Sequence, residues 1–166
     1  MRATGGRGGQ WTHGEMVSFG QLCPDIARHE VLQVVVRQGG ELPAGSYAFL
    51  EFHCPDPECD CQVVMWHVVG LDPVGREMSE GPLATFSWCW APDDPHGPGI
   101  EPAPQTRLAP VLLRELLRAI RDEGYGAQVQ AHYALVRRDA VTPGTAVYRI
   151  IHPERRTRRR STPHDQ

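Results

Sequence analysis

Residues 46–69 read SYAFLEFHCPDPECDCQVVMWHVV, and this stretch decides the fold. It consists of two strongly apolar runs, residues 46–53 and 62–69, joined by a short connection that carries three of the five cysteines. Both runs are dense in β-branched and aromatic residues, which favour the pleated, half-buried surface of a sheet. The stretch therefore predicts two strands joined by a cysteine-rich loop.

The cysteines of this loop have the spacing Cys-x4-Cys-x-Cys, formed by Cys54, Cys59 and Cys61. A structural zinc site takes about four thiolate or imidazole ligands, so one loop can supply three of them. Prolines between the first two cysteines stiffen the loop before metal binds, which lowers the cost of ordering it. Three acids interleaved with the cysteines add negative charge that favours a cation. The spacing therefore predicts a Zn²⁺ site.

A fourth ligand is then required, and the candidates are His53, His67, Cys89 and His132. His53 neighbours Cys54, and adjacent strand residues point to opposite faces, so it is a poor partner. His132 lies on the apolar face of a predicted helix that must pack on the sheet, and we expect it to be the fourth ligand. A histidine on such a face is also commonly a hydrogen-bonded core residue.

Two readings without zinc stay open for the three cysteines: a redox pair with a bystander, or an incidental cluster. If zinc is bound, three thiolates and a neutral imidazole give the site a net charge of about −1. Such an ion acidifies water weakly, which favours a structural metal over a catalytic one.

The remaining patterns predict an α+β fold. Residues 30–37 and 83–91 read as further strands, and residues 145–151 as an edge strand. Leucines at helical spacing predict a helix from Pro110 to Gly124, and a second apolar stripe predicts a helix over 126–139. The expected architecture is an antiparallel sheet of three to five strands packed against two C-terminal helices, with a zinc-bound loop.

The chain divides into three parts. Residues 1–29 are expected to be a flexible leader with a docking segment, because the Gly-rich start cannot bury enough apolar surface to fold. Residues 30–151 are expected to form a single zinc-binding α+β domain that includes a proline-rich loop over 91–109. Residues 152–166 are expected to be a disordered basic tail.

Charge is distributed unevenly along the chain. Residues 1–148 hold 11 Arg against 18 acids, a net charge of −7, which argues against a nucleic-acid surface on the folded body. The basic tail offers a weak contact for a polyanion through Arg155, Arg156, Arg158, Arg159 and Arg160. No signal peptide and no apolar run of about 20 residues is present, so we expect a cytoplasmic protein that makes no membrane contact.

The run Phe49-Leu50-Glu51-Phe52-His53-Cys54, followed by Cys59-Asp60-Cys61, resembles a family of small bacterial proteins of uncharacterised activity. Its members carry a strand followed by a Cys-x4-Cys-Asp-Cys motif, then an aromatic-rich strand and two helices. The likeness covers residues 42–138 and includes His132-Tyr133. It implies no activity, and this chain departs from the family in its proline-rich loop and basic tail.

Three functional hypotheses follow. The first is a zinc-stabilised binding or accessory module with an unknown protein or nucleic-acid partner, favoured because no phosphate loop, HExxH or GxSxG motif is present. The second is an enzyme with a site under the proline-rich loop that uses His67 or Cys89 as nucleophile or base, with an acid such as Asp93. The third is a nucleic-acid-associated protein that uses its Arg-rich tail as an arm, although such a tail is more often only solubilising.

Overall fold

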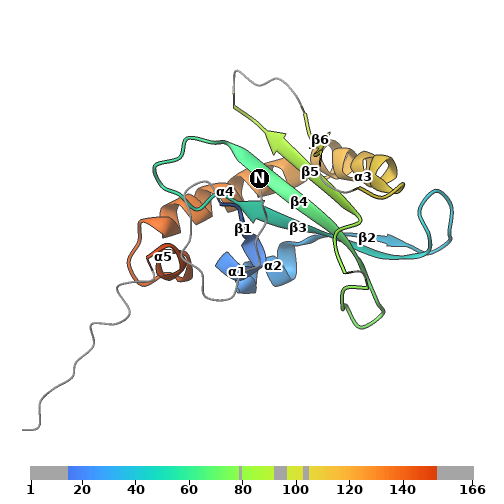
Figure 1. Ribbon diagram of the computed structural model, residues 1–166, viewed down its shortest axis with the longest axis horizontal. Helices are drawn as coiled ribbons and strands as arrows, with labels where there is room; N and C mark the ends of the chain where they lie inside the picture. The colour runs from blue at the N-terminus through green and yellow to red at the C-terminus, as the bar shows by residue number, and fades with distance from the viewer. Residues whose placement is uncertain (1–14, 79, 92–96, 103–104, 153–166) are drawn as a thin grey trace, which may run out of the picture.

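A long antiparallel hairpin forms the centre of the sheet (Figure 1). It consists of β3 (Gly45–His53) and β4 (Val63–Leu71), with Phe49 opposite Val68 and Glu51 opposite Trp66. The sheet continues through β5 (Ala84–Cys89) to the short β6 (Gly99–Ile100), which lies within the proline-rich loop. The structure is a computed structural model and describes residues 15–78, 80–91, 97–102 and 105–152.

The other edge of β3 is shared by two strands. β1 (Val17–Ser18) pairs with its last two residues, and β2 (Leu32–Val36) pairs with the segment from Gly45 to Phe49. Leu50 and Glu51 therefore lie between the two pairings. All pairings among these six strands are antiparallel, which confirms the predicted α+β fold.

Two helices cover one face of the sheet, α3 (Ala109–Asp122) and α4 (Tyr125–Ala140), and α4 crosses behind the strands in Figure 1. Alternate side chains of the three long strands face these helices, and Phe49, Trp66 and Phe86 are fully buried beneath them. Gly124 makes the turn between the helices with a φ of 75°, a conformation that favours glycine. The two predicted helices are thus confirmed, with the hydrophobic core between them and the sheet.

Three short helices form a second cluster beside the sheet. They are α1 (Phe19–Leu22), α2 (Pro24–Glu30) and α5 (Ala146–Ile151), and the cluster buries Phe19, Leu22 and Val147 with the end of α4. The edge strand predicted for residues 145–151 is wrong. The Thr145 hydroxyl caps the helix by accepting a hydrogen bond from the Tyr148 amide, and the apolar residues pack at helical spacing.

The expected leader and tail are only partly covered. Residues 1–14 and 153–166, including the five tail arginines, lie outside the described residues. Residues 17–29 of the predicted leader and docking segment form β1, α1 and all but the last residue of α2. Cys23-Pro24 indicates a turn or a helix start in the sequence, and α2 begins at Pro24. None of the helices in the described segments is long and apolar enough to cross a membrane.

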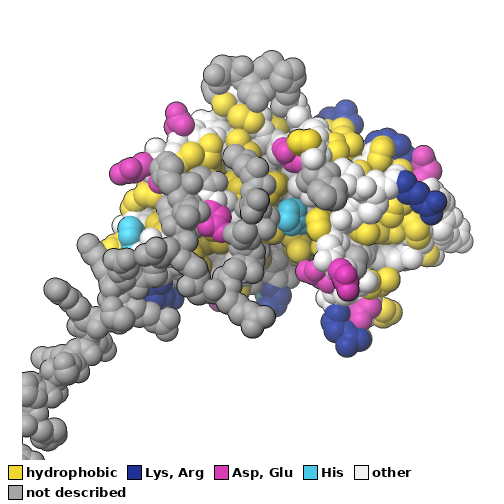
Figure 2. Space-filling view, viewed as in Figure 1, with side chains coloured by type: hydrophobic (Ala, Val, Ile, Leu, Met, Phe, Trp, Pro, Cys, Tyr) yellow, Lys and Arg dark blue, Asp and Glu magenta, His cyan; other side chains and the backbone are white. Residues whose placement is uncertain are grey.

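The face of the sheet opposite α3 and α4 also carries hydrophobic side chains, which are visible in Figure 2. At the end of this face nearest the cysteine loop, Met16, Cys54 and Met65 form a small buried cluster. The cysteine loop is therefore attached to the sheet by apolar packing as well as by its two strands.

Candidate metal-binding site

The connection between β3 and β4 folds back on itself through a tight turn. Oδ1 of Asp56 accepts a hydrogen bond from the Glu58 amide at 2.9 Å, and the Cys59 amide donates to the carbonyl of Asp56 at 3.2 Å. The Cys61 amide points at the sulfur of Cys59 from 3.4 Å. An aspartate that bonds the backbone two residues on is a common way to close such a turn. The turn returns the chain so that its cysteines face one another.

The sulfur atoms of Cys54, Cys59 and Cys61 all lie within 4.8 Å of one another. Sulfurs that share a tetrahedral zinc stand about 3.8 Å apart, given Zn–S bonds of about 2.3 Å. Cys54 is buried, and the other two are partly exposed. The sequence prediction that these three residues converge agrees with this geometry, which could hold a metal ion.

The thiols influence one another's protonation. Burial raises the pKa of Cys54, and burial and a hydrogen bond with Cys59 raise that of Cys61. Hydrogen bonding from Cys61 lowers the pKa of Cys59, which makes this sulfur the first thiolate of the group. A bound cation offsets the cost of burying the other two sulfurs as thiolates, since a coordinating thiol is deprotonated. Metal binding at this group would therefore release protons.

Helix α4 holds the loop from one side. The Tyr133 hydroxyl donates a hydrogen bond to the carbonyl of Cys61, and the Arg137 guanidinium donates to the carbonyls of Asp56 and Pro57. The guanidinium also lies over the Tyr133 ring, 5.6 Å from its centroid. The helix thus bonds both arms of the turn and places a positive charge against the loop.

His132, expected to be the fourth ligand, lies elsewhere. It is buried, its Nδ1 lies 2.8 Å from Oε2 of Glu51, and its Nε2 lies 2.9 Å from Oε2 of Glu30. Because carboxylate oxygens only accept, His132 donates from both ring nitrogens and is an imidazolium. The structure does not bring its ring to the sulfur atoms. Of the two readings from the sequence, the geometry is that of a hydrogen-bonded core histidine.

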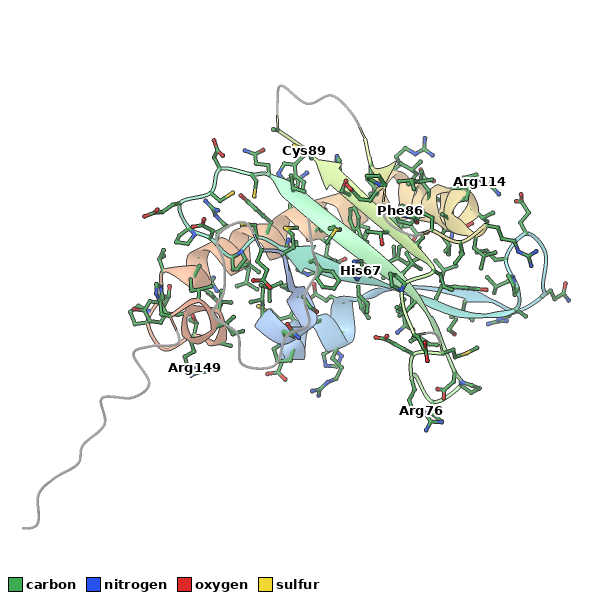
Figure 3. The ribbon with its side chains drawn as sticks, in the orientation of Figure 1. His67, Arg76, Phe86, Cys89, Arg114 and Arg149 are labelled. Atoms are coloured by element: carbon green, nitrogen blue, oxygen red, sulfur yellow. The ribbon has the colours of Figure 1, made fainter. Side chains whose placement is uncertain are left out.

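The other candidates occupy three different places. His53 is buried on the helix-facing side of β3, whereas His67 lies on the opposite face of β4 against Phe52. Cys89 ends β5 opposite Val63, and Figure 3 labels both His67 and Cys89. None of these residues joins the sulfur group in the described part of the chain.

Glu51 is the centre of a polar network that the sequence reasoning missed. His53 donates from Nε2 to Oε2 of Glu51 at 3.0 Å, and the Tyr125 hydroxyl donates to Oε1 at 2.6 Å. The indole N–H of Trp66 in turn donates to the Tyr125 oxygen at 3.1 Å. The ligand atoms of Glu51, His53 and His132 form a second group that could hold a metal ion.

The network sets the charge of its members. Burial works to raise the pKa of Glu51, but hydrogen bonds from His132 and His53 outweigh it and lower the pKa to about 2. Burial works to lower the pKa of His132, but Glu51 and Glu30 outweigh it and raise the pKa. Burial and the Glu51 charge hold the pKa of Tyr125 well above its ordinary value. Glu51 is therefore ionised at neutral pH, and Tyr125 is a hydrogen-bond donor.

Comparisons with known proteins assign no role to either group of ligand-forming residues. No family model, no curated protein and no solved structure matches this chain significantly. The chemistry of its own residues defines the protein: a small α+β domain with a three-cysteine group and a Glu/His2 group, each able to hold a metal ion.

Proposed function

We propose that this chain is a zinc-stabilised binding or accessory module, in which a structural Zn²⁺ is bound by Cys54, Cys59 and Cys61. The observation that carries the proposal is the convergence of three sulfur atoms within 4.8 Å on one short loop. Thiolate ligands select zinc among the divalent ions that are abundant in cells.

The role of the ion would be to stabilise the fold. Three thiolates give the zinc site a net charge of about −1, which leaves the ion little power to acidify a bound water molecule. Arg137 lies beside the loop and offsets part of that negative charge. Because an unfolded chain has no preformed site, zinc binding would add directly to the free energy of folding.

Two further features favour this function. All five cysteines are free thiols, as expected in a reducing compartment, which supports a cytoplasmic location. The loop is tied to α4 through Tyr133 and Arg137, so a zinc in it would fix the sheet relative to the helix. A surface held in this way suits a macromolecular partner, either protein or nucleic acid. Membership of the bacterial family with the Cys-x4-Cys-Asp-Cys motif is part of the same proposal.

Metal analysis of purified protein without a polyhistidine tag tests the zinc. The variant Cys59→Ser should contain about one equivalent of zinc per chain less than the wild type, since it removes a thiolate ligand. Cys89→Ser is the matched control, because Cys89 lies outside the sulfur group, and it should keep the wild-type zinc content. Equal zinc in Cys59→Ser and wild type would contradict the proposal.

A further inference from the structure

A second set of ligand-forming atoms converges on the opposite face of β3 from the Cys54 cluster. Oε2 of Glu51 lies 2.8 Å from Nδ1 of His132 and 3.0 Å from Nε2 of His53, and the three atoms lie within 4.8 Å of one another. All three residues are at least 95% buried. From this convergence we propose that Glu51, His53 and His132 bind a second divalent transition-metal ion, separate from the cysteine site.

The spacing of the three atoms fits one ion. A metal about 2.1 Å from each ligand atom would subtend angles of about 85° to 90° between Glu51 and each imidazole, given the two short separations. Such angles are those between neighbouring ligands of an octahedron. Two histidines and one carboxylate are also the ligand set of the facial triad of non-haem iron sites.

The groups around two of the three ligands, His132 and Glu51, are placed as a metal site requires. A metal-bound histidine usually donates its second ring N–H to a carboxylate, and Nε2 of His132 faces Glu30 at 2.9 Å. Glu30 is itself held by the Gln128 side-chain amide at 3.2 Å. The second oxygen of Glu51 accepts from Tyr125, which leaves Oε2 for the ion. These outer hydrogen bonds fix the direction of both ligands.

Charge balance also favours an ion. The carboxylates of Glu51 and Glu30 both lie within hydrogen-bond distance of the His132 ring, Glu51 buried and Glu30 about half exposed. A divalent ion bound by neutral imidazoles would match the two carboxylates. Buried charges are stable only when they are balanced by neighbours of opposite sign.

A cavity reaches the second site at Glu51. Because β1 and β2 leave Leu50 and Glu51 between them on the edge of β3, α1 and α2 cross this gap and enclose a cavity of about 260 Å³. Its walls include Glu51, Glu30 and Phe19, and the Phe19 ring stacks on His132 at 4.2 Å. An ion could reach Glu51 through this cavity, and a small molecule could approach it there.

The ligand set defines the class of ion. Two imidazoles disfavour Mg²⁺ and Ca²⁺, which prefer oxygen ligands, and the lack of thiolate in this group separates it from the cysteine site. The expected ions are Fe²⁺, Mn²⁺ and Zn²⁺. Co²⁺ is a suitable probe, because cobalt bound to thiolate gives an intense charge-transfer band whereas cobalt bound to imidazole and carboxylate gives only weak ligand-field bands.

The test adds Co²⁺ to the full, untagged chain that carries a single equivalent of zinc, bound by the cysteines. The visible spectrum and equilibrium dialysis are followed together. We expect about one further equivalent of Co²⁺ per chain, with ligand-field bands and no thiolate charge-transfer band. His132→Gln should weaken this binding at least tenfold, on the scale of losses at metal sites. His67→Gln, which alters a histidine on the other face of the sheet, should leave it unchanged.

Two results would overturn the second site: cobalt that appears only with a thiolate band, or a further equivalent that binds His132→Gln as tightly as wild type. If His132→Gln does not fold, nuclear magnetic resonance of the wild-type protein replaces it. Cobalt bound to Nδ1 of His132 should shift the signal of the Nε2–H proton, which is bonded to Glu30. If cobalt leaves that signal unshifted, the second site is contradicted. The thiolate charge-transfer band reports metal bound by the cysteines, and the ligand-field bands report metal bound by the Glu51 group. A negative result at one site therefore does not contradict the other.

Discussion

Nδ1 of His132 lies 2.8 Å from Oε2 of Glu51, a residue 81 positions earlier in the chain. This contact joins the middle of α4 to the middle of β3, and Tyr125 makes a second contact to the same carboxylate from the start of the helix. Tyr133 and Arg137 then meet the cysteine loop from the same helix. One buried carboxylate is thus bonded at two points to the helix that also holds the cysteine loop.

Replacing that carboxylate should be costly. Glu51→Gln removes the charge that pairs with His132 and should lower the free energy of unfolding by about 3 kcal/mol, measured by chemical denaturation. Glu30→Gln is the control. The Glu30 side chain is 47% exposed, so this change should lower the free energy of unfolding by less than about 1 kcal/mol. A loss in Glu51→Gln no larger than that in Glu30→Gln would show that the network does not hold the helix.

The Tyr133 hydroxyl should control how firmly the loop keeps its metal. Tyr133→Phe removes the hydrogen bond to the Cys61 carbonyl, with a cost of about 1 kcal/mol and faster release of zinc to a chromogenic chelator. Tyr47→Phe is matched to it, since its hydroxyl donates to the Pro43 carbonyl at 2.8 Å at the far end of β3. The two variants should lose similar stability, but only Tyr133→Phe should release zinc faster. Equal release rates would contradict this role.

The cysteines should differ in reactivity once metal is removed. Burial and the nearby Asp139 raise the pKa of Cys23 to about 11, so its thiolate should form only as the pH approaches that value. The pKa of Cys59 is lowered instead, and this thiol should react first with iodoacetamide at neutral pH. Peptide mapping by mass spectrometry measures both. Faster labelling of Cys23 than of Cys59 at pH 7 would contradict the assignment, and zinc should protect Cys59.

The sequence predicted those parts whose signal is local. Apolar runs dense in β-branched and aromatic residues predicted strands at residues 46–53, 62–69 and 83–91, and the structure has β3, β4 and β5 there. The spacing of Cys54, Cys59 and Cys61 within eight residues limits how far their sulfurs can separate, so their convergence could be predicted. The helices beginning at Ala109 and Tyr125 followed from apolar periodicity.

The parts that were missed depend on contacts between distant segments. The partners of His132 are Glu30 and Glu51, and no local pattern indicates that α2 and β3 meet at this helix. One signal was available: Glu51 alternates with Tyr47 and Phe49 on the core face, where a carboxylate needs partners. For residues 145–151, the β-branched residues suggested a strand, but packing against α1 and α4 stabilises a helix.

X-ray absorption at the zinc edge of the purified, untagged protein tests the central claim most directly. If Cys54, Cys59 and Cys61 bind the ion, the spectrum should show about three sulfur neighbours at about 2.3 Å, and they should decrease in Cys59→Ser. A zinc spectrum with only nitrogen and oxygen neighbours, or protein that folds fully without any zinc, would contradict the account.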